Sequence, residues 1–258
     1  MSVERPLLVS VMQFEDALKS GAMHVFDVID TAAQTGANGV ELRRELWSGW
    51  ESELSAARQQ GDEKGLLITY ATHATLFSTD PATLAGDIDA AAALGSPIIR
   101  FFPGQIPAQD DAASWAAGQA IADYAAQKGV IIALENYART PGGTLAEVKP
   151  ALVRIPSLMT NFDMGNYSLH DQDIPAAAAA LADRIVSSHL KDQTGNPADA
   201  PTVLGAGVLP LNAVFDALDS LPQRVIYCFE FRGGEDAVAR IEQSLAWLAA
   251  RGGKNSER

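Results

Sequence analysis

Short apolar runs alternate with longer segments of mixed polarity along the whole chain. The run VIIAL at 130–134 has no polar position, which is typical of a strand buried on both faces. Seven further runs of this kind are separated by segments that read as helices. The predicted strands are 6–12, 39–43, 65–73, 96–102, 129–135, 157–163, 184–190 and 224–230.

Residues that begin or end helices stand between these runs. Asp80 is placed to cap a helix that has Pro81 at its first position. Asp173 or Ile174, followed by Pro175, opens another helix in the same way. Glycines stand where helices would end and strands begin, at Gly36, Gly95 and Gly129.

Repeated strand–helix units predict a parallel sheet covered by helices. Eight such units in 258 residues favour a closed (β/α)8 TIM barrel of the α/β class over an open, doubly wound sheet. No glycine-rich phosphate-binding motif follows the first strand, where the open fold usually carries one. We expect a single barrel domain over 1–250 and a flexible C-terminal tail over 251–258.

Composition and charge narrow the possible partners. Hydrophobic residues make up 47% of the chain, which is ample for a core, and the net charge is −13. An acidic protein is poorly suited to nucleic acid or to an anionic membrane, so neither is expected as a partner. The one cysteine, Cys228, lies in an apolar run and is expected to be buried. Without a disulfide framework, a signal peptide or a membrane-spanning run, we expect a cytoplasmic protein.

Polar residues occur at the carboxyl ends of the predicted strands, where (β/α)8 barrels carry their chemistry. Side chains two apart in a strand share a face, so Glu41 should point the same way as Arg43. The same spacing pairs His189 with Lys191, and Glu230 with Arg232. The residues at these strand ends are Glu41, Arg43, His73, Arg100, Glu135, Asp163, His189, Lys191, Glu230 and Arg232.

Four of these residues form a candidate metal site: Glu135, Asp163, His189 and Glu230. Carboxylates and an imidazole suit a hard or borderline divalent cation, with Mn²⁺ placed first and Mg²⁺, Co²⁺ or Zn²⁺ as alternatives. Three converging carboxylates would repel one another without a cation. A metal ion would also explain why Glu135 ends a strand that is otherwise entirely apolar.

Each ligand has an ordinary explanation when it is taken alone. Asp163 can cap a turn, and His189 can be a core histidine with satisfied hydrogen bonds. Glu230 can form an ion pair with Arg232 or Arg224. Their occurrence on consecutive strands at the same depth favours the joint metal site.

Six motifs together resemble the sugar phosphate isomerase/epimerase superfamily of xylose isomerase-like TIM barrels. The motifs are GVELR, ALEN, FDMGN, SSHLKD, LGAGVLPL and CFEF, and the resemblance covers essentially the whole chain. It implies the four metal ligands above and places Lys191 near substrate oxygens. Two positions depart from the family pattern: Asn166 replaces a common histidine, and Ala206 replaces an acidic residue in the glycine motif.

The resemblance implies a metal-dependent isomerase or epimerase that acts on a ketose or keto-polyol. Glu135 and Glu230 would remove and return a proton, through an enediolate that the metal stabilises. Trp47 and Phe102 could cover an apolar face of the sugar. The expected substrate-binding residues are Glu41, Arg43, His73, Arg100, Asn136, Asn166, Lys191 and Arg232.

Two other functions stay open at this point. The same proton abstraction could end in loss of water, which would make the protein a lyase or dehydratase that acts on a keto-sugar or a 3-dehydroshikimate-like compound. A non-catalytic sugar-binding barrel is the third reading. Endonuclease IV chemistry is disfavoured, because it needs many imidazoles and the chain has 4 histidines. Clustered Lys and Arg are few, which favours an unphosphorylated substrate. The possibility of a homo-oligomer is left open.

Overall fold

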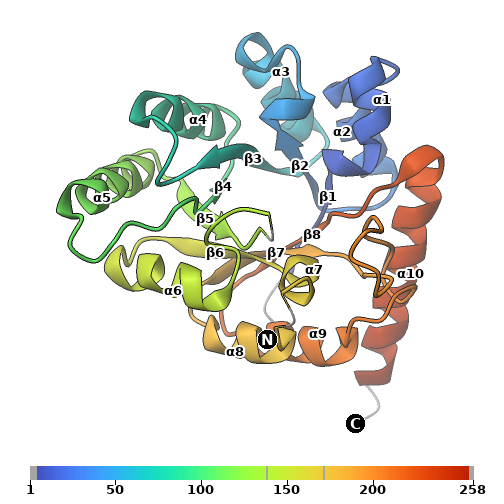
Figure 1. Ribbon diagram of the computed structural model, residues 1–258. Coiled ribbons are helices and arrows are strands. Elements are labelled where there is room, and N and C mark those ends of the chain that lie inside the picture. Colours follow the sequence, from blue (N-terminus) through green and yellow to red (C-terminus); the bar gives the residue numbers. More distant parts are fainter. Residues whose placement is uncertain (1–4, 138, 171, 256–258) are drawn as a thin grey trace.

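Eight parallel strands close into a barrel within the residues that the computed structural model describes, namely 5–137, 139–170 and 172–255. The strands pair in chain order, and β8 pairs with β1 to close the barrel (Figure 1). The prediction of a single (β/α)8 barrel is confirmed. The strands are β1 (Leu7–Ser10), β2 (Gly39–Arg43), β3 (Leu67–Thr75), β4 (Ile98–Phe102), β5 (Ile131–Glu135), β6 (Met159–Asp163), β7 (Ile185–Leu190) and β8 (Ile226–Phe229).

Helices surround the barrel on its outer side (Figure 1). The α-helices are α1 (Glu15–Ser20), α2 (Val25–Gln34), α3 (Trp50–Glu63), α4 (Pro81–Ala93), α5 (Ala112–Gln127), α6 (Leu145–Arg154), α7 (Met164–Ser168), α8 (Ile174–Ala180), α9 (Leu211–Asp219) and α10 (Ala237–Asn255). The short 3-10 helices are η1 (Val11–Phe14), η2 (Arg44–Leu46) and η3 (Gly234–Asp236). Since α10 continues to Asn255, helix extends into the segment expected as a tail, and residues 256–258 lie outside the described part.

The two predicted helix caps are present. The Asp80 carboxylate accepts the backbone N–H of Thr83, and Pro81 is the first residue of α4. Asp173 accepts the N–H of Ala176 at the start of α8. The first strand is shorter than predicted, because the Ser10 side chain accepts the N–H of Met12 and the chain turns into η1.

Apolar side chains form two separate cores. A small cluster of Leu8, Ile98, Ile226 and Cys228 comes from strands on different sides of the barrel and therefore fills its interior. The expected burial of Cys228 is confirmed, at 2% exposure. The large second cluster joins strand residues to the helices and holds the outer layer on the barrel. Apolar side chains thus fill the bottom of the barrel interior, and polar side chains concentrate at the carboxyl end of the barrel.

The glycine motif at 205–207 is fixed by Asp192, two residues after β7. The Asp192 carboxylate accepts backbone N–H groups from Gly205 at 3.2 Å, Gly207 at 3.0 Å and Leu209 at 3.0 Å. A Cβ at position 207 would lie 2.4 Å from an oxygen of that carboxylate, so only glycine fits there. The motif therefore shapes the loop after β7 without needing an acidic residue at Ala206.

In the described part of the chain, no helix is long and apolar enough to cross a membrane.

Candidate metal centre

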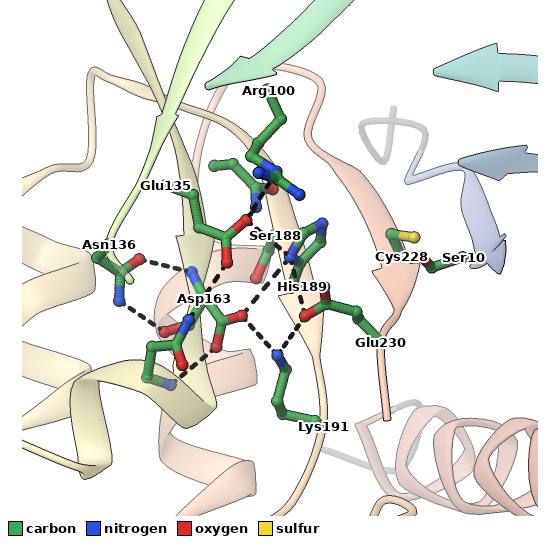
Figure 2. Close-up of polar contacts among 12 residues, drawn as sticks. Ser10, Arg100, Glu135, Asn136, Asp163, Ser188, His189, Lys191, Cys228 and Glu230 are labelled. Atoms are coloured by element: carbon green, nitrogen blue, oxygen red, sulfur yellow. Dashed lines mark hydrogen bonds and ion pairs between the residues drawn. The ribbon is translucent and has the colours of Figure 1, made fainter. Parts of the chain in front are cut away.

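The four predicted ligands come together at the carboxyl end of the barrel. Glu135, Asp163 and His189 end or nearly end β5, β6 and β7, and Glu230 directly follows β8. Each offers a ligand atom, and these atoms all lie within 4.8 Å of one another. Figure 2 shows the three carboxylates converging on the imidazole ring. The four residues are far apart in the sequence, so it is the closure of the barrel that brings them together.

The His189 ring is oriented by a carboxylate on the opposite side of the barrel. Nε2 lies 2.8 Å from Oε2 of Glu41 on β2. Nδ1 faces the cluster, at 3.2 Å from Glu230, 3.4 Å from Glu135 and 3.6 Å from Asp163. Nδ1 is buried and has no hydrogen-bond partner among the described residues. An imidazole nitrogen held in this way is suited to ligate a metal ion.

Glu135 is held by groups from three neighbouring elements. Its carboxylate forms an ion pair with Arg100 Nε at 3.0 Å and accepts from Asn166 Nδ2 at 3.2 Å and Asn161 Nδ2 at 3.4 Å. Burial alone would raise the pKa of Glu135, but the nearby charges of Arg100 and His189 hold it below its usual value. These two cations therefore favour the ionised form of Glu135.

Asp163 both caps a helix and faces the cluster. Its Oδ1 accepts the backbone N–H of Asn166 at the start of α7, at 2.8 Å. Its Oδ2 accepts from Lys191 Nζ at 2.6 Å and points toward His189. Asp163 can therefore both cap α7 and face the candidate metal site, because Oδ1 caps the helix while Oδ2 points toward His189. Burial raises the pKa of Asp163, and Lys191 partly offsets that rise.

Glu230 is bracketed by two cations. Its Oε1 accepts from Arg43, and its Oε2 accepts from Lys191. Burial would raise the pKa of Glu230, but His189, Lys191 and Arg43 hold it well below the ordinary value. Burial would likewise lower the pKa of His189, whereas Glu230, Glu41 and Glu135 raise it well above its usual range. The negative potential that favours a proton at Nδ1 also favours a metal cation there.

The donor set fits the divalent cation that the sequence predicts. Buried carboxylates and one unpartnered imidazole nitrogen match the oxygen and nitrogen ligands of Mn²⁺, Mg²⁺, Co²⁺ or Zn²⁺. The described residues contain a second group of possible ligands, Glu41, His189 and Cys228. It shares His189 with the first group, and burial raises the pKa of the Cys228 thiol well above normal, so its thiolate is disfavoured. The structure therefore favours the four predicted residues as the ligand set.

A chamber of about 470 Å³ opens above the cluster. One wall is a stack of three rings: His73 lies 6.0 Å from Phe102, and Phe102 lies 4.6 Å from Tyr137. The guanidinium of Arg100 sits 4.4 Å from the centre of the Phe102 ring. Burial lowers the pKa of His73, which favours its neutral form. The predicted residues that line the chamber are Arg43, His73, Glu135, Asn166, Lys191, Glu230 and Arg232.

Four predicted contacts lie away from the chamber. Both polar atoms of the Asn136 side chain bond the backbone of Asp163, at 2.9 and 2.8 Å, so Asn136 ties β5 to β6. Glu41 lies behind His189, and Arg100 lies behind Glu135 with Nη1 donating to Thr72 O. Trp47 donates to Glu53 at 2.6 Å and packs outside the chamber. Glu41 and Arg100 therefore contact His189 and Glu135 from behind, and Trp47 does not line the chamber.

Several lining residues escaped the sequence reasoning. Tyr137 and Arg139 also line the chamber, two and four positions after Glu135. The spacing of two that pairs the other strand-end residues would have indicated both. Gln193 and the loop 197–201 line it as well. No sequence signal marks that loop, because its place depends on the Asp192 contacts.

The fold and the site define a (β/α)8 barrel that gathers acidic and imidazole ligands at the carboxyl ends of its strands. The chain belongs to the xylose isomerase-like TIM barrel family, whose model matches residues 29–251. A sequence comparison with the curated proteins gives no match.

Similar solved structures share the whole fold at low sequence identity. D-allulose 3-epimerase from Methylomonas sp. is 20% identical with a TM-score of 0.78, over 96% of this chain and 98% of that one. A probable 3-DHS dehydratase, AsbF from Bacillus anthracis, is 17% identical with a TM-score of 0.77, over 95% and 98%. The 3-keto-D-glucoside 4-epimerase from E. coli is 16% identical with a TM-score of 0.74, over 96% and 100%. Identities this low establish a shared architecture and leave the activity to be argued from the site.

Proposed function

We propose that this protein is a divalent-metal-dependent isomerase or epimerase that acts on a ketose or keto-polyol. The observation that carries the proposal is the pair of buried carboxylates, Glu135 and Glu230, which face one chamber on either side of His189 Nδ1. They come from β5 and from the end of β8, with β6 and β7 between them. Two bases that reach one substrate from different strands suit proton removal at one face and return at another.

Glu135, Asp163, His189 and Glu230 would hold the metal ion, with Mn²⁺ our first choice. When bound, a divalent cation supplies Lewis-acid polarisation of a substrate carbonyl, which makes the neighbouring C–H more acidic. Glu41 would keep the His189 ring oriented, and Asn166 would keep the Glu135 carboxylate in place.

Glu135 is the better candidate to remove the proton. Its carboxylate is kept ionised, and its contacts to Arg100 and Asn166 fix its direction. Glu230 is ionised at rest, so it would first take a proton from the ammonium group of Lys191 and then pass that proton to the substrate carbon. The site would be reset when Glu135 releases its proton to solvent and the neutral Lys191 amine takes one up.

Arg43 and Lys191 are placed to bind substrate oxygens. Both are buried, both line the chamber, and both touch Glu230. Cationic donors in a site that excludes water stabilise negative charge as it develops on those oxygens. The ring stack of Phe102 and Tyr137 offers an apolar surface to the carbon face of the sugar.

Solvent exchange tests this proposal directly. The protein would be incubated with Mn²⁺ and a panel of ketoses in D₂O, and deuterium incorporation would be followed by NMR. We expect deuterium at one carbon next to the carbonyl of at least one ketose. Absence of exchange across the panel would overturn the proposal and leave a sugar-binding barrel.

A lyase is the second candidate, and the contact between Lys191 and Glu230 favours it. The ammonium group could protonate a departing hydroxyl after the same abstraction by Glu135. The resemblance in fold to the probable dehydratase is compatible with this outcome. In the exchange experiment, a dehydrated product together with deuterium incorporation would identify the lyase, and an isomeric sugar would identify the isomerase.

A further inference from the structure

A second cavity, of about 590 Å³, lies beside the chamber on the same face of the barrel. It is bounded by η1 and α1, which follow β1, and by the segment that joins β8 to α10. In Figure 1, α1 and the start of α10 flank the same side of the barrel. The lining of this cavity includes Met12, Gln13, Phe14, Glu15, Met23 and Arg232.

The cavity and the chamber share part of one wall. Met12, Glu15 and Arg232 line both spaces. Arg232 Nη2 lies 3.3 Å from Glu15 Oε2, and the Arg232 side chain is 61% exposed. The Glu15 side chain is largely buried and also pairs with Lys19, whereas the Arg232 side chain lies mostly in solvent, so a ligand can displace Arg232 at small cost. The two spaces can therefore accept a single ligand that spans this wall.

Two buried acceptor atoms beside the cavity make no hydrogen bond to the described residues. Gln13 is 1% exposed, and its Nε2 donates to Phe229 O at 3.1 Å. Its Oε1 is buried without a hydrogen-bond partner among the described residues. The same holds for Oε2 of Glu15, whose ion pair with Arg232 lacks hydrogen-bond geometry. A ligand that displaces Arg232 would open Oε2 of Glu15 to the cavity, and a donor on that ligand would satisfy it, since buried acceptors are rarely left unsatisfied.

The chemistry of the lining selects a neutral, hydroxylated ligand. Hydroxyl groups can donate to Glu15 once Arg232 is displaced, while Met12, Phe14 and Met23 offer apolar contact to carbon faces. Asp16, Asp236 and Glu242 also line the cavity and would repel an anion. Its volume lies within the range of about 300–1,000 Å³ that is usual for small-molecule sites. A sugar ring meets each of these requirements.

We propose that the substrate has two sugar parts: a keto-sugar unit in the metal chamber and a second glycosyl unit in the cavity beyond Glu15 and Arg232. This inference rests on the proposed function, since the keto-sugar unit is the one that undergoes proton transfer. The second unit is recognised by hydroxyl donors and carries no charge.

Exchange rates in D₂O test the two-part substrate. The probes are the keto-disaccharides turanose, maltulose and isomaltulose, compared with fructose. Ala239, at the start of α10, lines the cavity, and Ala239→Trp would fill it. Ala249→Trp is the matched control, because Ala249 is exposed on the same helix away from the cavity. We expect the best disaccharide to exchange at least tenfold faster than fructose, and this ratio to fall at least tenfold in Ala239→Trp but not in Ala249→Trp. An unchanged ratio in Ala239→Trp would overturn the inference.

A binding measurement separates this inference from the proposed function. Methyl α-D-glucopyranoside has no carbonyl, so its binding, followed by saturation-transfer NMR, needs no proton transfer. We expect a signal with the wild type and with Ala249→Trp, and its loss in Ala239→Trp. Glycoside binding without any ketose exchange would refute the proposed function alone. Fructose exchange without glycoside binding would refute the second subsite alone.

Discussion

His189 on β7 and Glu41 on β2 meet across the barrel through a hydrogen bond of 2.8 Å between Nε2 and Oε2. Burial would raise the pKa of Glu41, but His189 and Arg43 hold it well below its ordinary value, so the carboxylate accepts and Nε2 donates. This contact fixes the ring with Nδ1 toward the other three ligands. Glu41 thus completes the carboxylate–histidine arrangement that tunes many metal sites.

Replacing Glu41 with Gln should weaken metal binding although Glu41 is not itself a ligand. The neutral amide keeps an acceptor for Nε2 but loses the charge that makes the imidazole a stronger ligand. We expect the Kd for Mn²⁺, measured by titration calorimetry, to rise about 10-fold or more. Glu51→Gln, at an exposed position of α3, is the control and should bind like the wild type. Equal affinity in both variants would show that Glu41 does not support the metal site.

Replacing Glu230 with Gln should abolish turnover to the isomeric sugar. We expect kcat to fall by about 10² to 10⁴, because the amide cannot return a proton to the substrate carbon. The measurement is the rate of formation of the isomeric sugar at saturating Mn²⁺, so that any loss of metal affinity is compensated. Glu63→Gln, at the exposed end of α3, serves as the control. Retained formation of the isomeric sugar in Glu230→Gln would remove Glu230 from the acid–base assignment.

Replacing Asn166 with Ala should lower kcat more than it changes KM. Asn166 Nδ2 holds Oε1 of Glu135 at 3.2 Å, and its loss would let the carboxylate turn away from the reacting carbon. Misplacement of a catalytic group by about 1 Å can reduce the rate about 10²-fold, so we expect a loss of about 10-fold or more. The check is a full kinetic comparison with Asn212→Ala, an exposed control on α9. A change confined to KM would indicate direct substrate contact and contradict the positioning role.

Asp87 on α4 should make stability fall as pH rises. Its side chain is buried and accepts from Arg44 at 2.7 Å and Thr72 at 3.3 Å, yet burial outweighs these contacts and raises its pKa from 3.8 to about 6. The folded protein therefore holds this proton more tightly than the unfolded chain. By linkage, its stabilising effect is full below the unfolded pKa and is lost as pH rises to about 6. Two pKa units correspond to about 2 to 3 kcal/mol.

Urea unfolding at about pH 4 and about pH 6.5 measures this effect. Asp87→Asn stays neutral, so the fall in unfolding free energy between these values should be smaller than in the wild type by about 2 kcal/mol. Asp62→Asn is the control, because Asp62 is exposed and should leave the pH dependence unchanged. An identical pH dependence in the wild type and Asp87→Asn would contradict the prediction.

The sequence by itself determined the architecture and indicated the four candidate ligands. Strand-length apolar runs, each followed by a helix, can bury both faces only in a covered parallel sheet, and eight of them close into a barrel. Glu135, Asp163, His189 and Glu230 follow because each marks the polar end of such a run. These signals lie within short segments of the chain, so a single sequence is enough to identify them.

Tertiary structure alone decided how the remaining polar residues are used. Glu41 and His189 are separated by 148 residues, and nothing local distinguishes a carboxylate that orients an imidazole from one that binds substrate. Nor does anything local show that the Asn136 side chain bonds the backbone of β6 instead of a substrate. The second cavity exists because barrel closure brings the segments after β1 and β8 together. Contacts of this kind depend on which strand ends become neighbours, and that is fixed only when the whole barrel has formed.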